Sequence, residues 1–182
     1  MNTAMRINTT IKAKKVLIMG LENSGKTSIV LCLRGVNDLS SFSSLKPTRG
    51  FTIKKFQALG SEYSIWDFGG QEQFREGYLN DFQNHIKKSN KFIYVLDIQD
   101  QERFDISLDY LDKIVILLRK NKVNIDFSIF LHKYDPDLEF TKEFSDKVIS
   151  DLIKNIKELI PNDFMYQIYK TSIYTVFQKL GI

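Results

Sequence analysis

One eight-residue stretch near the start of the chain constrains its fold more than any other feature. Residues 20–27 read Gly-Leu-Glu-Asn-Ser-Gly-Lys-Thr, and they follow directly on the apolar run at residues 16–19. Two glycines at this spacing before Lys-Thr are typical of a phosphate-binding loop, in which successive backbone N–H groups point at an anion. Such a loop joins a strand to a helix, and the apolar residues 29–31 continue this one as a helix. The stretch therefore predicts an α/β fold that binds a nucleoside triphosphate.

The residues of this loop are expected to make different contacts with the nucleotide and its metal ion. The Lys26 ammonium would reach the β- and γ-phosphates, and the Thr27 hydroxyl would hold Mg²⁺. Glu22 places a carboxylate beside the phosphates, so we expect it to slow hydrolysis and to hinder entry of a partner's arginine. The remaining loop positions expected to contact the nucleotide are Asn23, Ser24, Gly25 and Ser28.

Strand-like and helix-like segments alternate along the chain, which predicts a doubly wound, mostly parallel sheet of six strands with helices on both faces. The expected strands are residues 15–19, 51–59, 61–67, 92–96, 127–131 and 164–169. The expected helices are residues 26–34, 72–88, 106–119, 141–159 and 172–180. Gly60 is so short a link between the second and third strands that they should form an antiparallel hairpin, which leaves one antiparallel edge strand. The polar, serine-rich residues 37–47 are expected to be a mobile loop.

Length and composition favour one domain with an ordinary core. The chain has 182 residues, of which 43% are hydrophobic and 26% charged, and this suffices for one hydrophobic core. The single cysteine, Cys32, excludes an internal disulfide, and we expect it to be a small buried residue. The 26 basic residues are nearly offset by 22 acidic ones, so a solvated surface is favoured over nucleic-acid binding.

We expect residues 1–13 to be an N-terminal tail and residues 14–182 to be the domain. The tail lacks the apolar core of a signal peptide, and no run reaches the roughly 20 apolar residues of a membrane span. Position 2 is Asn rather than Gly, and the C-terminus offers no cysteine, so neither myristoylation nor prenylation is indicated. The expected location is the cytoplasm, with contact to a membrane, if any, made through partners.

A second motif, Trp-Asp-Phe-Gly-Gly-Gln-Glu at residues 66–72, follows the expected third strand. Ligands of such sheets bind at the carboxyl ends of the strands, so Asp67 is well placed to hold Mg²⁺ through water. Gly70 lets the backbone approach a γ-phosphate. Gln71 can both donate to and accept from a water, which makes it the candidate for orienting an attacking water. The alternative is a plain Gly-Gly turn with Gln71 on the surface.

A third motif, Leu-His-Lys-Tyr-Asp at residues 131–135, ends the expected fifth strand. The Asp135 carboxylate can accept parallel hydrogen bonds from guanine N1–H and the exocyclic amine, a pair that adenine lacks, so it would select guanine. The stem of Lys133 can lie along the purine face. His132 either donates a hydrogen bond to guanine N7 or is a satisfied strand-end residue, and the sequence leaves both readings open.

Together these motifs resemble the Ras-like small GTPases, which are P-loop NTPases, over about residues 14–181. Trp-Asp-x-Gly-Gly-Gln-Glu narrows the resemblance to the Arf-like and Rag/Gtr-like branches, and Pro-Thr-Arg-Gly-Phe at residues 47–51 is similar to the Arf-type first switch. By this resemblance the Thr48 hydroxyl binds Mg²⁺ and its backbone N–H the γ-phosphate. His-Lys-x-Asp and the Thr-Ser-Ile of residues 171–173 look Rag-like, and the loop of Ser172 and Ile173 would bring a backbone N–H to guanine O6.

The resemblance implies a GTP/GDP switch that uses Mg²⁺, hydrolyses GTP slowly, and works with protein effectors, an exchange factor and an activating protein. Unaided turnover should be on the order of 10⁻⁴ to 10⁻² per second. No arginine finger in cis is indicated, because Arg49 and Arg75 are expected to be solvated residues that meet a partner. We expect neither the Arf N-terminal helix nor the Rag dimerisation domain in this chain, so the resemblance does not extend to membrane recruitment or obligate pairing. A homodimer or heterodimer stays open.

Two other functions remain as alternatives. The first is a nucleotide-dependent scaffold, or pseudo-GTPase, with little or no turnover. Glu22 supports this alternative, whereas Gln71 argues against it. The second is a P-loop kinase or ATPase. That class needs an acceptor site or a lid, often rich in arginine, and the sequence offers neither.

Overall fold

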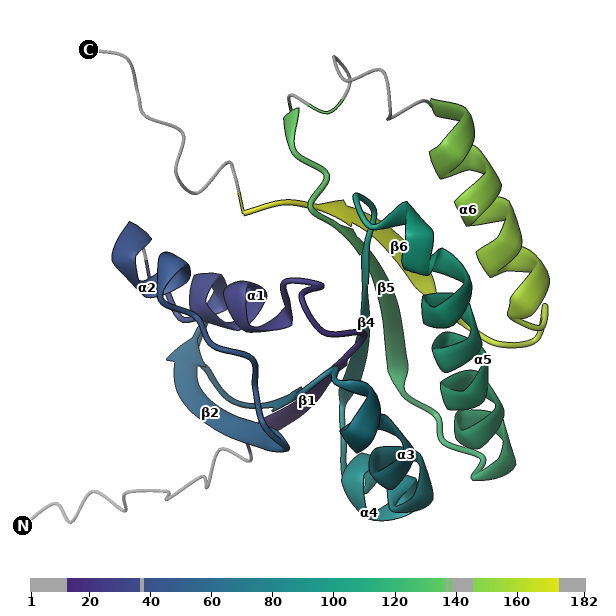
Figure 1. Cartoon of the computed structure of the whole chain (residues 1–182). Helices are drawn as coiled ribbons and strands as arrows, with labels where there is room; N and C mark the ends of the chain where they lie inside the picture. The colour runs from purple at the N-terminus through teal and green to yellow at the C-terminus, as the bar shows by residue number, and fades with distance from the viewer. Residues whose placement is uncertain (1–12, 37, 137, 139–145, 174–182) are drawn as a thin grey trace, which may run out of the picture.

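A six-stranded sheet forms the centre of the computed structural model, which describes residues 13–36, 38–136, 138 and 146–173 (Figure 1). Its strands are β1 (Lys14–Met19), β2 (Phe51–Ala58), β3 (Ser61–Phe68), β4 (Lys91–Asp97), β5 (Asp126–His132) and β6 (Gln167–Thr171). They are ordered β2-β3-β1-β4-β5-β6, and only β2 runs antiparallel to its neighbour. The predicted doubly wound sheet with one antiparallel edge strand is confirmed.

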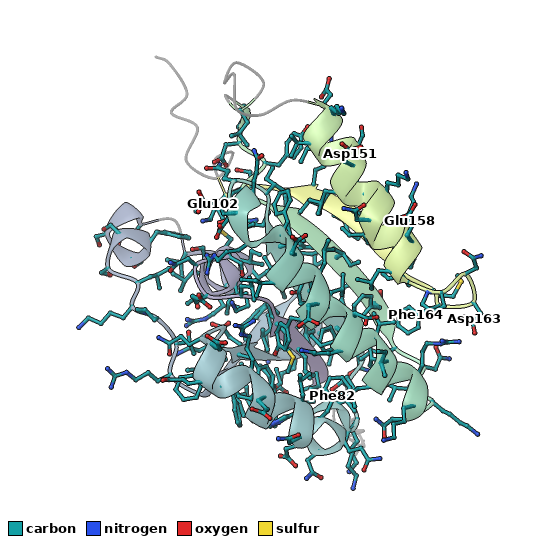
Figure 2. The ribbon with its side chains drawn as sticks, turned by 45° about the vertical axis from the view of Figure 1, so that its right-hand side comes forward. Phe82, Glu102, Asp151, Glu158, Asp163 and Phe164 are labelled. Carbon is teal, nitrogen blue, oxygen red and sulfur yellow. The ribbon has the colours of Figure 1, made fainter. Side chains whose placement is uncertain are left out.

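Helices cover both faces of this sheet, with α1 on one side and α3, α5 and α6 on the other (Figure 1). The helical elements are α1 (Lys26–Leu33), α2 (Leu39–Ser43), α3 (Glu72–Asn80), α4 (Phe82–Ile86), the 3₁₀ turn η1 (Gln101–Arg103), α5 (Phe104–Lys120) and α6 (Asp146–Leu159). The outer side of α6 is charged, and Asp151 and Glu158 project from it into solvent (Figure 2). Among the described residues, none of the helices combines the length and the apolar character that crossing a membrane demands.

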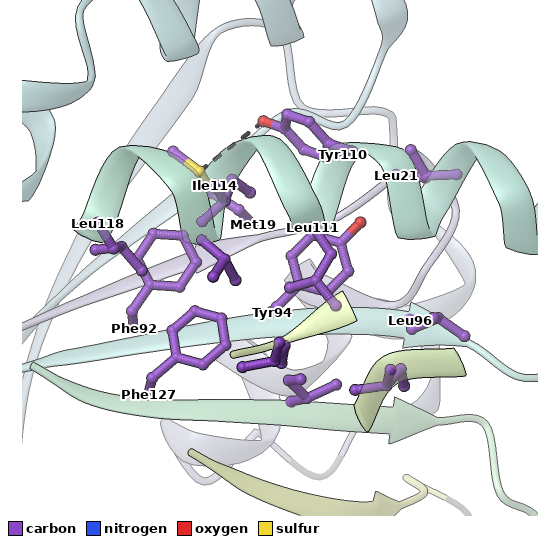
Figure 3. Packing of buried hydrophobic residues seen from close by; sticks show 14 of the residues in the cluster. Met19, Leu21, Phe92, Tyr94, Leu96, Tyr110, Leu111, Ile114, Leu118 and Phe127 are labelled. Atoms are coloured by element: carbon purple, nitrogen blue, oxygen red, sulfur yellow. Dashed lines mark hydrogen bonds between the residues drawn. The ribbon is translucent and has the colours of Figure 1, made fainter. Parts of the chain in front are cut away.

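Strand alternation divides the core into two layers. On β1, Leu17 and Met19 face α5, whereas Val16 and Ile18 face α1. The larger layer packs α5 against β4 and β5 (Figure 3). There, the rings of Phe92 and Phe127 stack at 5.4 Å between centres. Burying both faces of the central strands fixes their register, and this holds the carboxyl ends of β1, β3, β4 and β5 at one edge.

Two of the expected elements in the first half of the chain differ in the structure. Residues 37–47 were expected to be a mobile loop, yet they contain α2, whose Asp38 side chain accepts hydrogen bonds from the backbone of Ser40 and Ser41. The expected helix over residues 72–88 is two helices, because the backbone leaves helical geometry at Asp81 (φ −102°, ψ 21°). This break lets the ring of Phe82 reach Phe92, at 6.2 Å between centres.

The end of the chain also differs from expectation. The last strand was expected at residues 164–169, but β6 covers 167–171, with Ile168 opposite Ile129 of β5. Phe164 instead lies in the preceding turn and packs edge-on against Phe127 at 5.4 Å. Ser172 and Ile173 lie outside any helix, so the expected closing helix does not begin at residue 172. The rest of that helix, the start expected for α6 at residues 141–145, and residues 1–12 of the expected tail lie outside the described residues.

Candidate functional site

The loop at residues 20–27 connects β1 to α1 and needs glycine at its two ends. Gly25 has φ 85°, and a Cβ there would lie 2.4 Å from the His132 ring. A Cβ on Gly20 would lie 2.1 Å from the carbonyl oxygen of Val95. No side chain caps the first turn of α1, so the N–H groups of that turn remain free to face an anion. The loop thus has the backbone of a phosphate cradle.

Lys26 is folded back into this cradle. Its ammonium donates to the carbonyl oxygen of Leu21 at 2.5 Å and to the Ser24 hydroxyl at 3.3 Å. The side chain is only 5% exposed, and burial lowers the pKa of its ammonium to about 8. Ser24, within the loop, is buried, and its hydroxyl donates to the same carbonyl at 2.9 Å. A buried cation pointed at backbone oxygen is well prepared to exchange that partner for phosphate oxygen.

Three oxygen-bearing side chains converge beside Lys26. The hydroxyl of Thr27 donates to the Asp67 carboxylate at 2.7 Å and lies 3.2 Å from the Thr48 hydroxyl. Pairing of the parallel strands β1 and β3 sets Ile18 opposite Asp67, which brings that carboxylate to the loop. Burial raises the pKa of Asp67, and its Oδ1 is buried without a hydrogen-bond partner. Hard oxygen donors with one carboxylate oxygen to spare fit Mg²⁺.

The segment at residues 47–51 and the segment from residue 66 to Tyr78, which are the two expected switch segments, contact each other and the loop at residues 20–27. The backbone N–H of Gly69 donates to the carbonyl of Gly50 at 2.8 Å, and the Tyr78 hydroxyl donates to the same oxygen at 2.7 Å. Gly70 lies so close to the loop that a Cβ on it would be 2.1 Å from the backbone nitrogen of Glu22. A movement of either segment would therefore displace the other segment and the loop.

A cavity of about 240 Å³ opens where these groups meet. Many of the predicted site residues line it: Glu22, Asn23, Gly25, Lys26, Thr27, Ser28, Thr48, Gly70, Gln71 and Lys133. The carbonyl oxygen of the Gln71 side chain is buried without a hydrogen-bond partner. The sequence did not identify Phe42, Leu45, Lys46 and Pro47 as lining residues, and the structure places them on the same cavity because α2 folds over it.

The expected base-reading residues gather at the ends of β5 and β6. The Asp135 carboxylate accepts hydrogen bonds from the Ser172 hydroxyl and, at 2.9 Å, from the side-chain amide of Gln99. Gln99 also donates to the carbonyl of Lys133 at 2.9 Å, and the Lys133 ammonium donates to Asp97 at 2.5 Å. Gln99 and Asp97 were not identified from the sequence, because Asp97 ends β4 and Gln99 follows it, both outside the motifs. Ile173 follows Ser172 in the chain, and its approach to the base stays a prediction.

His132 is packed between the loop and β6. It is 2% exposed, its Nδ1 lies 2.9 Å from the Thr171 hydroxyl, and its ring lies against Gly25. Burial lowers its pKa to about 4, so the ring is neutral at pH 7. This arrangement favours the reading of His132 as a satisfied strand-end residue that supports the loop. Its contact with guanine N7 stays a prediction.

The low pKa of His132 should make stability depend on pH. Between pH 6.5 and 4 His132 binds a proton in the unfolded state but not in the folded state. Its contribution to the free energy of unfolding is therefore complete above pH 6.5 and is lost as the pH falls. We expect a loss of about 3 kcal/mol across this window, measured by urea unfolding at pH 7.5 and 4.5. His132→Asn should lack this component. Equal losses in the variant and the wild type would contradict the assignment.

Two side chains near the site depart from expectation. Arg75 is half-buried rather than fully solvated: its guanidinium lies 5.5 Å from the centre of the Tyr110 ring, and its Nε is buried without a hydrogen-bond partner. Cys32 is half-buried rather than buried. Phe51, at the end of the segment at residues 47–51, is 40% exposed, and its ring stacks on that of Trp66 at 5.2 Å between centres.

Comparison with known proteins agrees with this geometry. Residues 15–179 match the family model described as the Gtr1/RagA G protein conserved region. The chain is 34% identical over 104 residues to ADP-ribosylation factor-like protein alp41 of Schizosaccharomyces pombe, covering 56% of this chain and 50% of that one. It is 33% identical over 133 residues to ADP-ribosylation factor-like protein 2 of Dictyostelium discoideum, covering 72% of this chain and 66% of that one.

The matches therefore span between half and just under two thirds of the length of these curated relatives. Among solved structures, the Arl6 BBS3 small GTPase of Trypanosoma brucei with bound GppNp superposes with a TM-score of 0.69. That match covers 92% of this chain and 91% of the other at 19% identity, and it shows a shared fold.

Proposed function

Because the chain belongs to the Gtr1/RagA G-protein family and is a Ras-like small GTPase with Arf-like features, we propose that it switches between GTP-bound and GDP-bound states. In this proposal it binds the nucleotide with Mg²⁺ and slowly hydrolyses GTP. One observation carries the proposal: Lys26, Thr27 and Gln71 meet Thr48 around a single cavity, with the Asp67 carboxylate directly behind. Three segments far apart in the sequence thus supply the parts that phosphoryl transfer to water requires.

Each residue has a separate role in the proposed reaction. Lys26 offsets charge on the β- and γ-phosphate oxygens, while the N–H groups of the loop hold the phosphates in place. Thr27, Thr48 and, through water, Asp67 would hold Mg²⁺, which when bound neutralises further charge on the same oxygens. Gln71, with its buried and unpaired side-chain oxygen, orients the attacking water.

Switching follows from contacts that exist only while the γ-phosphate does. Thr48 and Gly70 would bind this group, and hydrolysis would release both. Since Gly50 holds Gly69 and Tyr78 through hydrogen bonds, release of one switch moves the other and reshapes the exposed Phe51 surface. Effectors, an exchange factor and an activating protein would read this surface, and they would also bring the chain to a membrane if it acts there. Pairing with a second copy or another chain would use the same face.

Gln71→Leu should slow hydrolysis of bound GTP at least tenfold, because leucine cannot orient water. The measurement is single-turnover release of phosphate from preloaded GTP, with GTP affinity measured in parallel and expected to stay within a few-fold. Gln73→Leu, on the exposed side of α3, is the matched control and should hydrolyse GTP at the wild-type rate. A scaffold without turnover predicts no difference between wild type and Gln71→Leu.

The nucleotide that co-purifies with the chain tests the ligand itself. GDP or GTP would support Asp135 as the reader of the base. ATP in its place would favour a P-loop kinase or ATPase and would count against this role.

A further inference from the structure

The loop residue Glu22 is tied to a distant part of the chain. Its Oε1 lies 2.6 Å from Nη1 of Arg103, which belongs to η1 at the start of α5. Nη2 of the same arginine reaches the backbone carbonyl of Glu22 at 3.4 Å. One guanidinium therefore holds both the side chain and the backbone of this loop position.

Arg103 is itself fixed in orientation. Asp100, three residues earlier, accepts a hydrogen bond from its Nε at 2.6 Å and a second from Nη2. Such two-point pairing with a carboxylate leaves Nη1 pointing in one direction, which here is towards Glu22. The arginine side chain is 28% exposed and that of Glu22 is 35% exposed, so solvent screens the pair only in part.

The pair borders the place where phosphates are expected to bind. Glu22 lines the 240 Å³ cavity, and its second carboxylate oxygen, Oε2, is buried without a hydrogen-bond partner. The charges of Glu22 and Arg103 both act on the Lys26 ammonium. Burial lowers the pKa of this ammonium to about 8, and of the two charges Glu22 raises the pKa and Arg103 lowers it. An uncompensated carboxylate at this position would repel a triphosphate, and the repulsion would grow with each phosphate charge.

We propose that Arg103 is a positioning residue of the nucleotide site, which turns the Glu22 carboxylate towards η1 and offsets part of its charge, so that the pair sets how long a nucleotide stays bound. This inference rests on the proposed function, because it takes the cavity to hold a guanine nucleotide. It also revises the expectation drawn from Glu22 alone. With Arg103 in place the carboxylate does not face the phosphates as a free charge.

The test is the dissociation rate of fluorescent GDP and of a non-hydrolysable GTP analogue from Arg103→Gln, in the wild-type and Glu22→Gln backgrounds. Arg103→Gln alone should accelerate release of the GTP analogue roughly tenfold and of GDP roughly threefold, because the triphosphate carries more charge. In the Glu22→Gln background the same substitution should change both rates far less, since the only carboxylate that then loses its partner is that of Asp100, which does not line the cavity. High salt should shrink the effect of the single variant.

The matched control is Arg119→Gln, which removes another arginine–carboxylate pair, that with Asp163 at 3.1 Å. Asp163 lies at the far end of α5 from Glu102, the neighbour of Arg103 (Figure 2), so this variant should release nucleotides at the wild-type rate. Equal acceleration by Arg103→Gln in both backgrounds would overturn the inference, because it would mean that Arg103 acts through the fold and not through Glu22. Unchanged rates in Arg103→Gln would overturn it too and leave the proposed function standing. A wild-type chain that binds no guanine nucleotide would overturn both.

Discussion

Replacing Lys26 with methionine should lower the affinity for GTP and GDP at least about a hundredfold, because it removes the one cation buried in the phosphate cradle. Methionine has nearly the same length, so the cavity keeps its shape while its charge is lost. The measurement is equilibrium titration with a fluorescent GDP. In the wild type the pKa of Lys26 is about 8, so GDP affinity should also weaken as pH rises above 8. This pH dependence should be absent from the variant.

The same substitution should not weaken the empty protein. Burial lowers the pKa of Lys26 from 10.5 to about 8, so at pH 7 the folded state carries a buried charge that costs about 3 kcal/mol. Methionine removes this cost and also the hydrogen bonds to Leu21 and Ser24, which offset part of the gain. The free energy of unfolding of the nucleotide-free variant should therefore rise by about 1 to 3 kcal/mol.

Lys113→Met is the matched control for this variant. Lys113 lies on the exposed side of α5 and pairs with Asp109 at 2.7 Å, and neither residue lines the cavity. It should leave GDP affinity unchanged and alter stability by less than about 1 kcal/mol. If Lys26→Met bound GDP within a few-fold of wild type, the loop would not be the phosphate site.

The sheet was predictable from the sequence because its strands are short apolar runs separated by clear breaks. Residues 92–96 and 127–131 contribute to the core layers on both faces of the sheet, and their position could be read from composition alone. The position of β6 could not be read in this way. Phe164 and Tyr166 look like strand residues, but pairing of Ile168 with Ile129 moves the strand towards the C-terminus, and this is a choice made by tertiary contact.

Short helices were harder to predict where serine and aspartate side chains can hydrogen-bond to the backbone. Serine is a weak helix former, so residues 39–43 show no helical pattern, and α2 exists because Asp38 caps its first N–H groups. An aspartate two residues before the pair Ser40-Ser41 was the available signal. The break at Asp81 had no such signal, since it results from Phe82 reaching the core beside Phe92.

The site was predictable as far as its motifs are contiguous. Lys26, Thr27 and Asp67 were assigned from short patterns, and the structure brings them together. Arg103 and Gln99 were missed because their contacts are made at long range, 81 residues from Glu22 and 36 residues from Asp135. Nothing in the segment at residues 99–103 marks these partners. Only the register of β4 beside β1 and β5 places them at the cavity.

Asp135→Asn should exchange the preferred base, because an amide can donate where the carboxylate only accepts. Guanine N1–H and its amine would lose one of their two acceptor oxygens and face an N–H donor in its place, whereas the 2-oxo group of xanthine would gain a donor. We expect GDP affinity to fall at least about a hundredfold and xanthosine diphosphate to become the tighter ligand. Competition of each nucleotide against a fluorescent analogue measures the two affinities.

The neighbours of Asp135 decide whether this variant keeps its fold. Ser172 and Gln99 both donate to the wild-type carboxylate, and asparagine retains one acceptor oxygen for them. The Gln99 amide can turn to offer its oxygen to the new NH₂ group, so the loop can stay satisfied without moving. Asp151→Asn, on the exposed side of α6 (Figure 2), is the matched control and should keep the wild-type preference. An Asp135→Asn variant that still prefers guanine would show that this loop does not read the base.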